Sequence, residues 1–154
     1  GIRAGDVVRL AGILKKNNNI SKVYGLARKE MAPVLLHAAA FDPDIKSIAL
    51  IEPYSSYQSI VMNHFYNPVF VHSLVPGALK AYDLPDLEAS LAPRKLLLVN
   101  FTDGNSKSTD VESINKDLEL VKTVYRSLNA DGQLNIVSDK SSDKISDLYP
   151  EWIK

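Results

Sequence analysis

Ser47-Ile48-Ala49-Leu50-Ile51 forms a continuous apolar run, and Leu96-Leu97-Leu98-Val99 forms a second one. Short apolar runs of this kind, without alternating polar residues, are typical of strands that are buried on both faces, as in parallel sheets. Parallel strands need a long connection between them, which is usually a helix. The two runs therefore predict the centre of an α/β fold with a mostly parallel sheet.

Segments with helical patterns stand on both sides of the two runs. Asp6 is expected to cap a first helix that reaches Lys16, and a short strand is expected at 22–26. Further helices are expected at 30–40, 57–63, 86–91, 110–129 and near Trp152, and a last strand at 133–137. Helices and strands thus alternate along the chain. This order favours one α/β domain over residues 1–154, with about four strands and right-handed crossovers.

Length and composition set limits on function. The chain has 154 residues, of which 45% are hydrophobic, enough for the core of one domain. It has 18 Lys and Arg and 18 Asp and Glu, so the formal net charge is zero. A nucleic-acid binder or a polybasic membrane binder needs a cationic excess, so we expect neither nucleic acid nor membrane as a partner. Low net charge permits self-association.

The residue types present also limit the chemistry. The sequence has no cysteine, which rules out a thiol nucleophile and Cys-ligated zinc, and nothing in it indicates a cofactor. No apolar run reaches the ~18 residues needed to cross a bilayer. The first residues show no signal peptide, although the sequence would also fit a piece that begins inside a longer chain.

The stretch Tyr24-Gly25-Leu26-Ala27-Arg28-Lys29-Glu30-Met31 is expected to join a strand tightly to a helix. It resembles the nucleophile elbow of α/β-hydrolases, whose pattern is Gly-x-Ser-x-Gly. Gly25 falls on the first Gly, Ala27 on the Ser and Lys29 on the second Gly. Segments 37–46, 75–87 and 91–100 continue the resemblance, toward bacterial hydrolases similar to acetyl xylan esterases. Its most specific parts are Asp83-Leu84-Pro85-Asp86-Leu87 and Ala92-Pro93-Arg94.

The resemblance extends from about residue 6 to residue 152 and implies only the C-terminal half of the hydrolase fold. It implies that Ala27 stands at the nucleophile position, in a sharp strand-to-helix turn, and that Asp103 stands nearby at the acid position. The base would be a His near 139–142, yet no His follows His72. A methyl group cannot attack a carbonyl, and a hydroxyl is a poor nucleophile without a base. Two of the three catalytic roles are therefore vacant.

The remaining catalytic and binding candidates each have a structural alternative. Asp103 stands before a Gly, which also fits a turn after a strand. The binding candidates are Gly25, Arg28, Ser55 and Ser56. The two serines would line a pocket at the sheet edge or cap the next helix. Arg28 and Lys29 would attract an anion at a helix start, or pair with Glu30 in solvent.

The three histidines do not indicate a metal centre. His37 lies among apolar residues of an expected helix and fits a place in the core. His64 and His72 are eight residues apart, without a third ligand at metal-binding spacing. The sequence therefore predicts no metal site.

Three functional hypotheses follow. The first is a hydrolase-like domain that has lost catalysis and acts as a structural or binding element. The second is part of an active carbohydrate esterase whose missing groups lie on another segment or chain. The third is a small doubly-wound domain that binds a ligand at its strand ends. The resemblance implies a carbohydrate ester as ligand and a secreted or periplasmic bacterial protein, while the residues themselves leave the compartment open.

One partner is expected on structural grounds. In the full hydrolase fold the strand at 23–26 is paired on both sides, so in this chain one side has no partner. An exposed strand edge invites pairing. We expect a second copy of the chain or the N-terminal half of the same protein to cover it.

Overall fold

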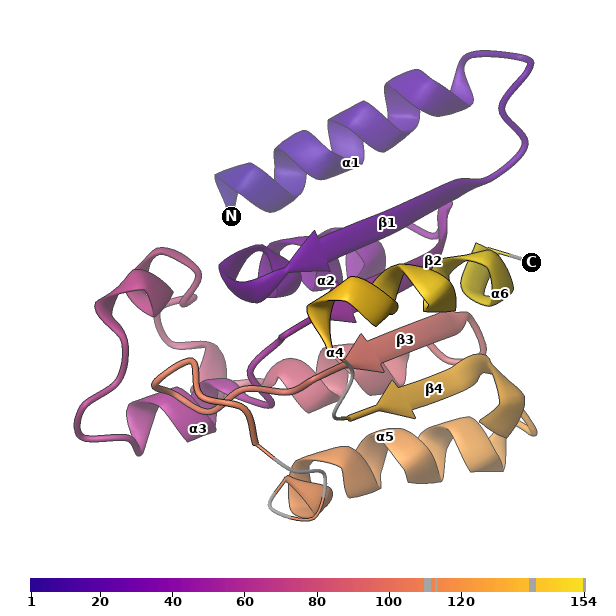
Figure 1. The fold of residues 1–154 in the computed structure, drawn as a ribbon. Coiled ribbons are helices and arrows are strands. Elements are labelled where there is room, and N and C mark those ends of the chain that lie inside the picture. The colour runs from indigo at the N-terminus through magenta and orange to yellow at the C-terminus, as the bar shows by residue number, and fades with distance from the viewer. Residues whose placement is uncertain (110–111, 113, 139–140, 154) are drawn as a thin grey trace.

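The computed structural model describes residues 1–109, 112, 114–138 and 141–153, and its strands form a single parallel sheet (Figure 1). The strand order is β1-β2-β3-β4, which is also the order along the chain. The strands are β1 (Val23–Arg28), β2 (Ile45–Ile51), β3 (Lys95–Val99) and β4 (Leu134–Val137). The α/β class, the parallel pairing and the four strands are as predicted.

The longer helices lie together on one face of the sheet. They are α1 (Ile2–Lys15), α2 (Ala32–Phe41), α4 (Leu84–Ser90) and α5 (Asn115–Ser127), and α1 packs on α2, α2 on α4 and α4 on α5. Right-handed crossovers between strands in sequential order place all connecting helices on the same face. The short helix α6 (Tyr149–Ile153) lies on the opposite face, as Figure 1 shows.

The two central strands are buried on both faces. Ile48 and Leu50 of β2 belong to the large core that includes the helices of the first face. Ala49 and Ile51 belong to a smaller core on the α6 face, together with Trp152. These four β2 residues are at most 2% exposed. This double burial explains why β2 and β3 carry uninterrupted apolar runs.

The excursion between β2 and β3 holds α3 (Tyr57–Val61), α4 and two 3₁₀ helices, Pro68–His72 and Ala78–Lys80. The carboxylate of Asp83 caps α4 in a capping box with Asp86. It also accepts hydrogen bonds from the backbone N–H of Tyr57 (2.6 Å) and of Gln58 (3.1 Å). One carboxylate thus closes the N-termini of two helices.

The boundaries of several elements differ from those expected. Helix α1 begins at Ile2, so Asp6 is not its cap but lies inside it and accepts a hydrogen bond from Arg9. The expected helix at 110–129 is observed as Asn115–Ser127, and residues 110, 111 and 113 lie outside the described residues. None of the helices in the described ranges has the length and hydropathy needed to span a bilayer.

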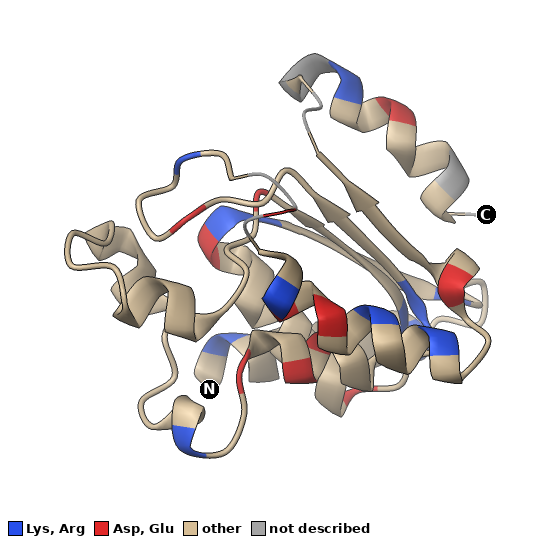
Figure 2. Cartoon of the chain, turned by 90° about the horizontal axis from the view of Figure 1, so that it is seen from below, with Lys and Arg blue, Asp and Glu red and all other residues tan. Residues whose placement is uncertain are grey.

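Charged residues of both signs are interspersed along the chain (Figure 2). One of them, Glu88 of α4, lies inside the helix layer and is only 1% exposed. Its Oε2 atom finds no hydrogen-bond partner among the described residues. Burial, reinforced by the negative charges of Asp117 and Asp83, raises the pKa of Glu88 to about 8. Glu88 is therefore held protonated at neutral pH.

This burial predicts how stability depends on pH. Because the folded-state pKa of Glu88 lies above its ordinary value of 4.5, the folded state binds an extra proton between the two values. The free energy of unfolding should fall as the pH rises through this window, by at most about 1.4 kcal/mol per pH unit. Glu88→Gln should remove this decline in urea denaturation at pH 5.5 and 8. The matched change Glu119→Gln, at an exposed position of α5, should leave it in place. An unchanged decline in Glu88→Gln would contradict the assignment.

Candidate functional site at the carboxyl edge of the sheet

The first three strands end in the same unusual backbone turn. Lys29 follows β1 with φ 53°, Glu52 follows β2 with φ 54°, and Asn100 follows β3 with φ 53°. This left-handed region is strained for residues that carry a Cβ atom. The turns bring three polar residues to the carboxyl edge, where parallel sheets bind their ligands.

An ion-pair cluster joins the first two turns. Arg28 donates from Nε to Glu52 Oε2 (3.0 Å) and from Nη2 to Glu52 Oε1 (2.7 Å), so the pair is bidentate. The Nζ of Lys29 lies 3.6 Å from Glu52 Oε2. The hydrogen bond from Arg28 is the main cause that lowers the pKa of Glu52. Two cations thus share one carboxylate, which leaves the cluster with one net positive charge.

The partner of the two cations differs from the one expected. The sequence suggested Glu30 as the alternative to an anion, but Arg28 and Lys29 pair with Glu52. Parallel pairing aligns Arg28 with Ile51, and this register places Glu52 beside both cations. No local pattern in the sequence points to Glu52, because it lies more than twenty positions from Arg28 and Lys29.

Ala27 does not lie at the sharp turn. It belongs to β1, where it is aligned with Leu50 of β2, and its side chain is 9% exposed. The residue in the left-handed turn is Lys29, two positions later, and a 3₁₀ turn then leads into α2. The strand-to-helix junction expected from the sequence is therefore present, with a lysine at the turn.

Asp103 lies in the loop after β3 and closes that loop. Its Oδ1 accepts hydrogen bonds from the backbone N–H of Asn105 (2.8 Å) and of Lys107 (2.9 Å). Its own N–H donates to the Lys107 carbonyl. These bonds are those of an Asx-type turn, the structural alternative that the sequence offered.

The two candidate serines are only 2% exposed. Ser56 caps α3 by accepting a hydrogen bond from the N–H of Ser59 (3.0 Å), as its capping alternative predicted. Ser55 is not a cap, since its hydroxyl donates to Asp117 Oδ2 of α5 (2.6 Å). Both serines hold neighbouring elements together.

At Gly25, β1 lies close to Leu35 of α2. A Cβ atom at this position would lie 2.5 Å from Cδ1 of Leu35, a distance that real contacts do not tolerate. The glycine of the elbow-like pattern thus has a packing reason in this chain.

His37 is buried in the helix layer and engaged at both ring nitrogens. Nδ1 lies 2.7 Å from the Pro33 carbonyl, so it carries the proton, and Nε2 accepts from the Tyr82 hydroxyl (2.9 Å). Burial lowers the pKa of His37. Within the described part of the chain, no group of three His, Cys, Asp or Glu residues could hold a metal ion.

The chain thus has a four-stranded parallel α/β sheet with a left-handed strand-to-helix junction and polar residues at its carboxyl edge. Among solved structures, the chain is similar to a carbohydrate esterase family 15 (CE15) glucuronoyl esterase from Caldicellulosiruptor kristjansonii, with a TM-score of 0.61 and 16% identity. The match covers 94% of this chain and 47% of that chain, so this chain spans about half the length of the esterase. At this identity the likeness establishes the fold.

The sequence comparisons give no further assignment. No family model matches the sequence, and a search of the curated proteins finds no match.

Replacing Gly25 tests the packing of the elbow-like segment. Gly25→Ala should lower the free energy of unfolding by about 1–3 kcal/mol, because Leu35 must move out of a packed core. Gly12→Ala is the matched control, since nothing lies within 4 Å of its added Cβ in α1, and it should stabilise by about 0.5–1 kcal/mol. Chemical denaturation of the two variants measures both changes. An unchanged free energy of unfolding in Gly25→Ala would contradict the close packing of Leu35 against Gly25.

Removing the shared carboxylate tests the ion-pair cluster. Glu52→Gln should lower the free energy of unfolding by about 1 kcal/mol at pH 7. Because the folded-state pKa of Glu52 is lowered, its contribution is present above the ordinary pKa and is lost as the pH falls through the folded value. The loss in Glu52→Gln should therefore vanish in strongly acidic solution. Asp44→Asn removes an exposed carboxylate 3.9 Å from Lys15 and Lys46, and its effect should be smaller at every pH.

Proposed function

We propose that this chain is a carbohydrate-esterase-like α/β-hydrolase domain that lacks esterase activity of its own and acts as a structural or binding element. The observation that carries the proposal is the residue at the strand-to-helix turn. Where a hydrolase elbow presents a serine hydroxyl, this chain presents the ammonium of Lys29, held against Glu52. A protonated amine beside a carboxylate does not attack an ester carbonyl.

The groups needed for acyl transfer are missing on either alignment of the elbow. If Ala27 is the nucleophile position, as the sequence resemblance implies, the side chain is a buried methyl group. If the turn itself defines the position, the side chain is that of Lys29. A base is also needed, and His37 is engaged with Pro33 and Tyr82 in the helix layer. Asp103, the proposed acid position, would have no imidazole to orient.

Within the carbohydrate esterases, the sequence resemblance favours acetyl-xylan-esterase-like proteins, and we extend the proposal to a carbohydrate ester as ligand and to a secreted or periplasmic location. Arg28 and Lys29 supply the binding groups in this proposal. Each side chain is about half exposed beside the nearly buried Glu52. Both can therefore reach an oxygen of a ligand while the carboxylate keeps them in place.

One observation favours an alternative. The match covers only 47% of the solved esterase, so the chain would also suit a portion of an active carbohydrate esterase whose nucleophile and base come from another segment or chain. In that case Glu52 and Asp103 would be acidic groups at the shared carboxyl edge. A small α/β domain that binds an anion at Arg28 and Lys29 is the remaining alternative, without the doubly-wound topology expected from the sequence, because the strands are in sequential order and their connecting helices share one face.

Restoring a hydroxyl should not restore catalysis. Neither Lys29→Ser nor Ala27→Ser should hydrolyse an aryl acetate above the buffer rate or react with a fluorophosphonate probe, because no His follows His72 in the sequence and His37 is engaged with Pro33 and Tyr82. Lys29→Ser is the sharper test, since its hydroxyl would stand at the turn. Labelling of Lys29→Ser, or turnover by the unmodified chain that survives repurification, would overturn the proposal and support the active-esterase alternative.

The binding role has a separate readout. Acetylated xylo-oligosaccharides should raise the melting temperature of the chain, since a ligand that binds only the folded state stabilises it. The rise should disappear in Arg28→Gln and persist in Arg126→Gln, which changes an exposed arginine on α5. An equal rise with inorganic phosphate would favour the anion-binding alternative.

A further inference from the structure

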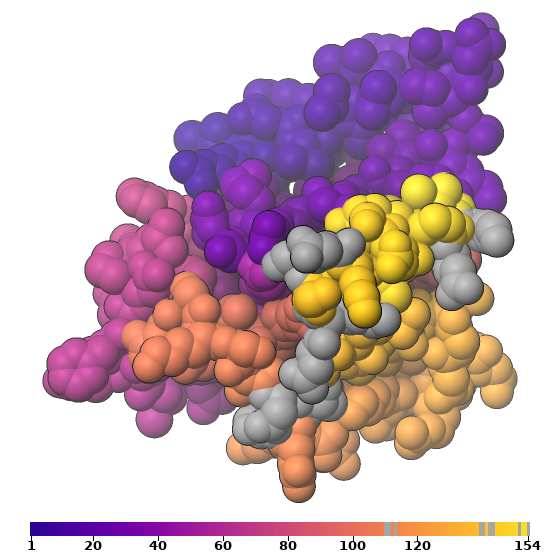
Figure 3. All heavy atoms as spheres, in the orientation of Figure 1, coloured from indigo at the N-terminus to yellow at the C-terminus, as the bar shows by residue number. Residues whose placement is uncertain are grey.

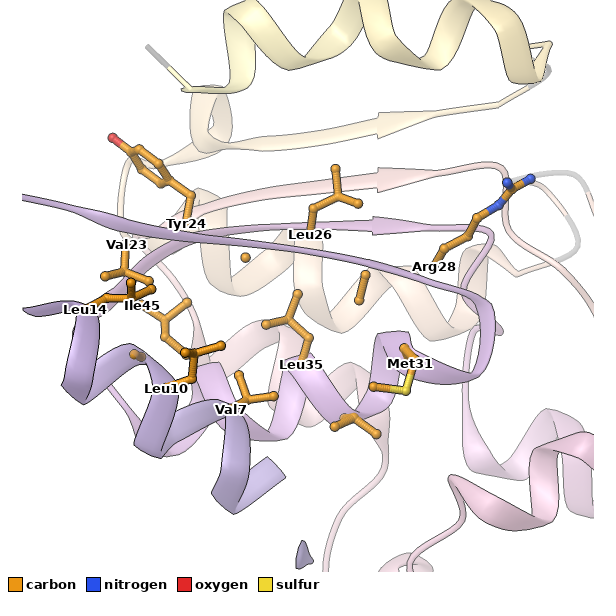
Figure 4. Close-up of a pocket in the computed structure, with 14 residues that line it drawn as sticks. Val7, Leu10, Leu14, Val23, Tyr24, Leu26, Arg28, Met31, Leu35 and Ile45 are labelled. Atoms are coloured by element: carbon orange, nitrogen blue, oxygen red, sulfur yellow. The ribbon is translucent and has the colours of Figure 1, made fainter. Parts of the chain in front are cut away.

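Several hollows open on the surface formed by the described residues, and a large one among them is apolar. This groove of about 520 Å³ lies between α1 and β1 (Figures 3 and 4). Its charged lining residue, Arg28, is already held by Glu52. The groove follows the outer edge of β1, for which the sequence already led us to expect a second copy or the N-terminal half of the protein as a partner. It therefore gives no reason to invoke a small ligand.

A smaller hollow lies at the other end of the sheet from the candidate site. It has a volume of about 200 Å³, it is formed where β3 and β4 begin, and Trp152 of α6 is one of its lining residues. Figure 1 shows the starts of both strands and α6 together on the right, opposite the arrowheads that mark the carboxyl edge. Pockets for drug-sized ligands measure ~300–1,000 Å³, so this hollow admits a molecule of about one ring.

Sheet register explains why polar side chains gather at this hollow. Leu97 of β3 is aligned with Asn135 of β4, and residues two positions apart on a strand share a face. Lys95 therefore points to the same face as Leu97 and Asn135. This is the face that α6 covers, because Leu97 packs in the smaller core beside Trp152. Farther along β3 the same face carries the apolar Val99, so the α6 face becomes polar only where the strands begin.

The polar side chains that line the hollow have no partners within the described residues. In this part of the chain, Lys95 forms no ion pair, and the amides of Gln133 and Asn135 form no hydrogen bond. The indole Nε1 of Trp152 is buried and also lacks a partner among the described residues. Buried donors without an acceptor are rare in folded proteins. Ammonium, amide and indole N–H groups thus gather at one small hollow, and this corner of the molecule is short of an acceptor.

We propose that this hollow binds a small organic carboxylate whose apolar ring or chain lies against the indole of Trp152. The carboxylate oxygens accept a charge-assisted hydrogen bond from the ammonium of Lys95 and further hydrogen bonds from the amides of Gln133 and Asn135. The site goes beyond the function proposed above, because it lies at the opposite end of the sheet from Arg28. Either proposal can therefore fail without the other.

Two other kinds of small ligand fit these groups less well. A neutral sugar would leave the positive charge of the half-buried Lys95 without a counter-charge, which is unfavourable once the ligand displaces water. Inorganic phosphate would pair with the ammonium, but it has no apolar part to place against Trp152. A carboxylate that carries a ring or a short chain matches both the single cation and the aromatic wall.

The test uses the fluorescence of Trp152, which is the single tryptophan of the sequence and therefore reports on this hollow directly. Sodium benzoate is the probe, and benzamide, which has the same ring without the charge, is its neutral counterpart. Both are titrated at pH 7 and constant ionic strength. We expect a saturable change with benzoate and an affinity for benzamide that is lower by about tenfold, because the charge-assisted bond is lost.

Four variants assign the response to the hollow. Lys95→Met keeps the apolar stem of the lysine and should weaken benzoate binding by about tenfold, and Asn135→Leu should weaken it by about threefold. Lys80→Met changes a lysine of the excursion and is the matched control, which should leave the affinity unchanged. Arg28→Gln should also leave it unchanged, because Arg28 belongs to the other edge of the sheet. The melting temperature of each free variant shows that it is folded.

Several results would overturn the proposal. The absence of a saturable response to benzoate would remove the site, and equal affinities for benzoate and benzamide would remove the role of the charge. Equal weakening in Lys95→Met and Lys80→Met would show a general effect of charge. A response that disappears in Arg28→Gln would place the carboxylate at the candidate site instead. A Trp152 response to xylo-oligosaccharides that Lys95→Met abolishes would assign the hollow to a sugar.

Discussion

The burial of β2 and β3 on both faces is the constraint on which the rest of the structure depends. Both strands need a covering on two sides, and Ser47, the buried polar residue of β2, donates its hydroxyl to the Lys95 carbonyl (3.3 Å). The helices α2, α4 and α5 supply one covering, and α6 with its preceding turn supplies the other. The connections must therefore be long, and polar residues are left to the strand ends. The carboxyl edge becomes the place where the chain can hold chemically active groups.

Much of this architecture could be predicted from the sequence, because burial leaves a direct trace in residue type. The apolar runs at 47–51 and 96–99 gave the central strands and their parallel pairing. The starts of the helices were predicted less accurately. Asp6 has the right chemistry for a cap, yet α1 begins four residues earlier, because a local preference is weaker than the packing of α1 on α2.

The candidate site was harder to predict, because its residues come from different strands and meet only when those strands pair in the observed register. Arg28 and Lys29 were visible as cations, but Glu52 becomes their partner only when β1 and β2 are aligned. The elbow-like pattern predicted the strand-to-helix junction but not the residue at its turn. A Cβ atom at Gly25 would meet Leu35, so this glycine is needed for packing, and the left-handed residue of the turn is Lys29. Asp103 closes a turn and Ser56 caps a helix, which are the structural roles that the sequence offered as alternatives to a functional role for these two residues.

The two most specific parts of the family resemblance hold the fold together. In Ala92-Pro93-Arg94, the guanidinium of Arg94 donates to the carbonyls of Asp42 (3.2 Å) and Ile45 (2.9 Å), which ties the start of β3 to the start of β2. In Asp83-Leu84-Pro85-Asp86-Leu87, Asp83 closes two helix N-termini. Both features stabilise the sheet and its helices.

The shared carboxylate of Asp83 joins two segments that lie far apart in the sequence. The N-termini of α3 and α4 lie more than twenty residues apart in the sequence, and loss of the Asp83 carboxylate would remove a hydrogen-bond acceptor from both, while Ser56 would still cap α3. The segment between them is fastened at further points, because the Tyr57 hydroxyl donates to the Ser73 carbonyl (3.1 Å) and the N–H of Asn67 donates to the Gly104 carbonyl (2.7 Å). The excursion between β2 and β3 is therefore tied both to itself and to the loop that follows β3, and it forms part of the packed domain.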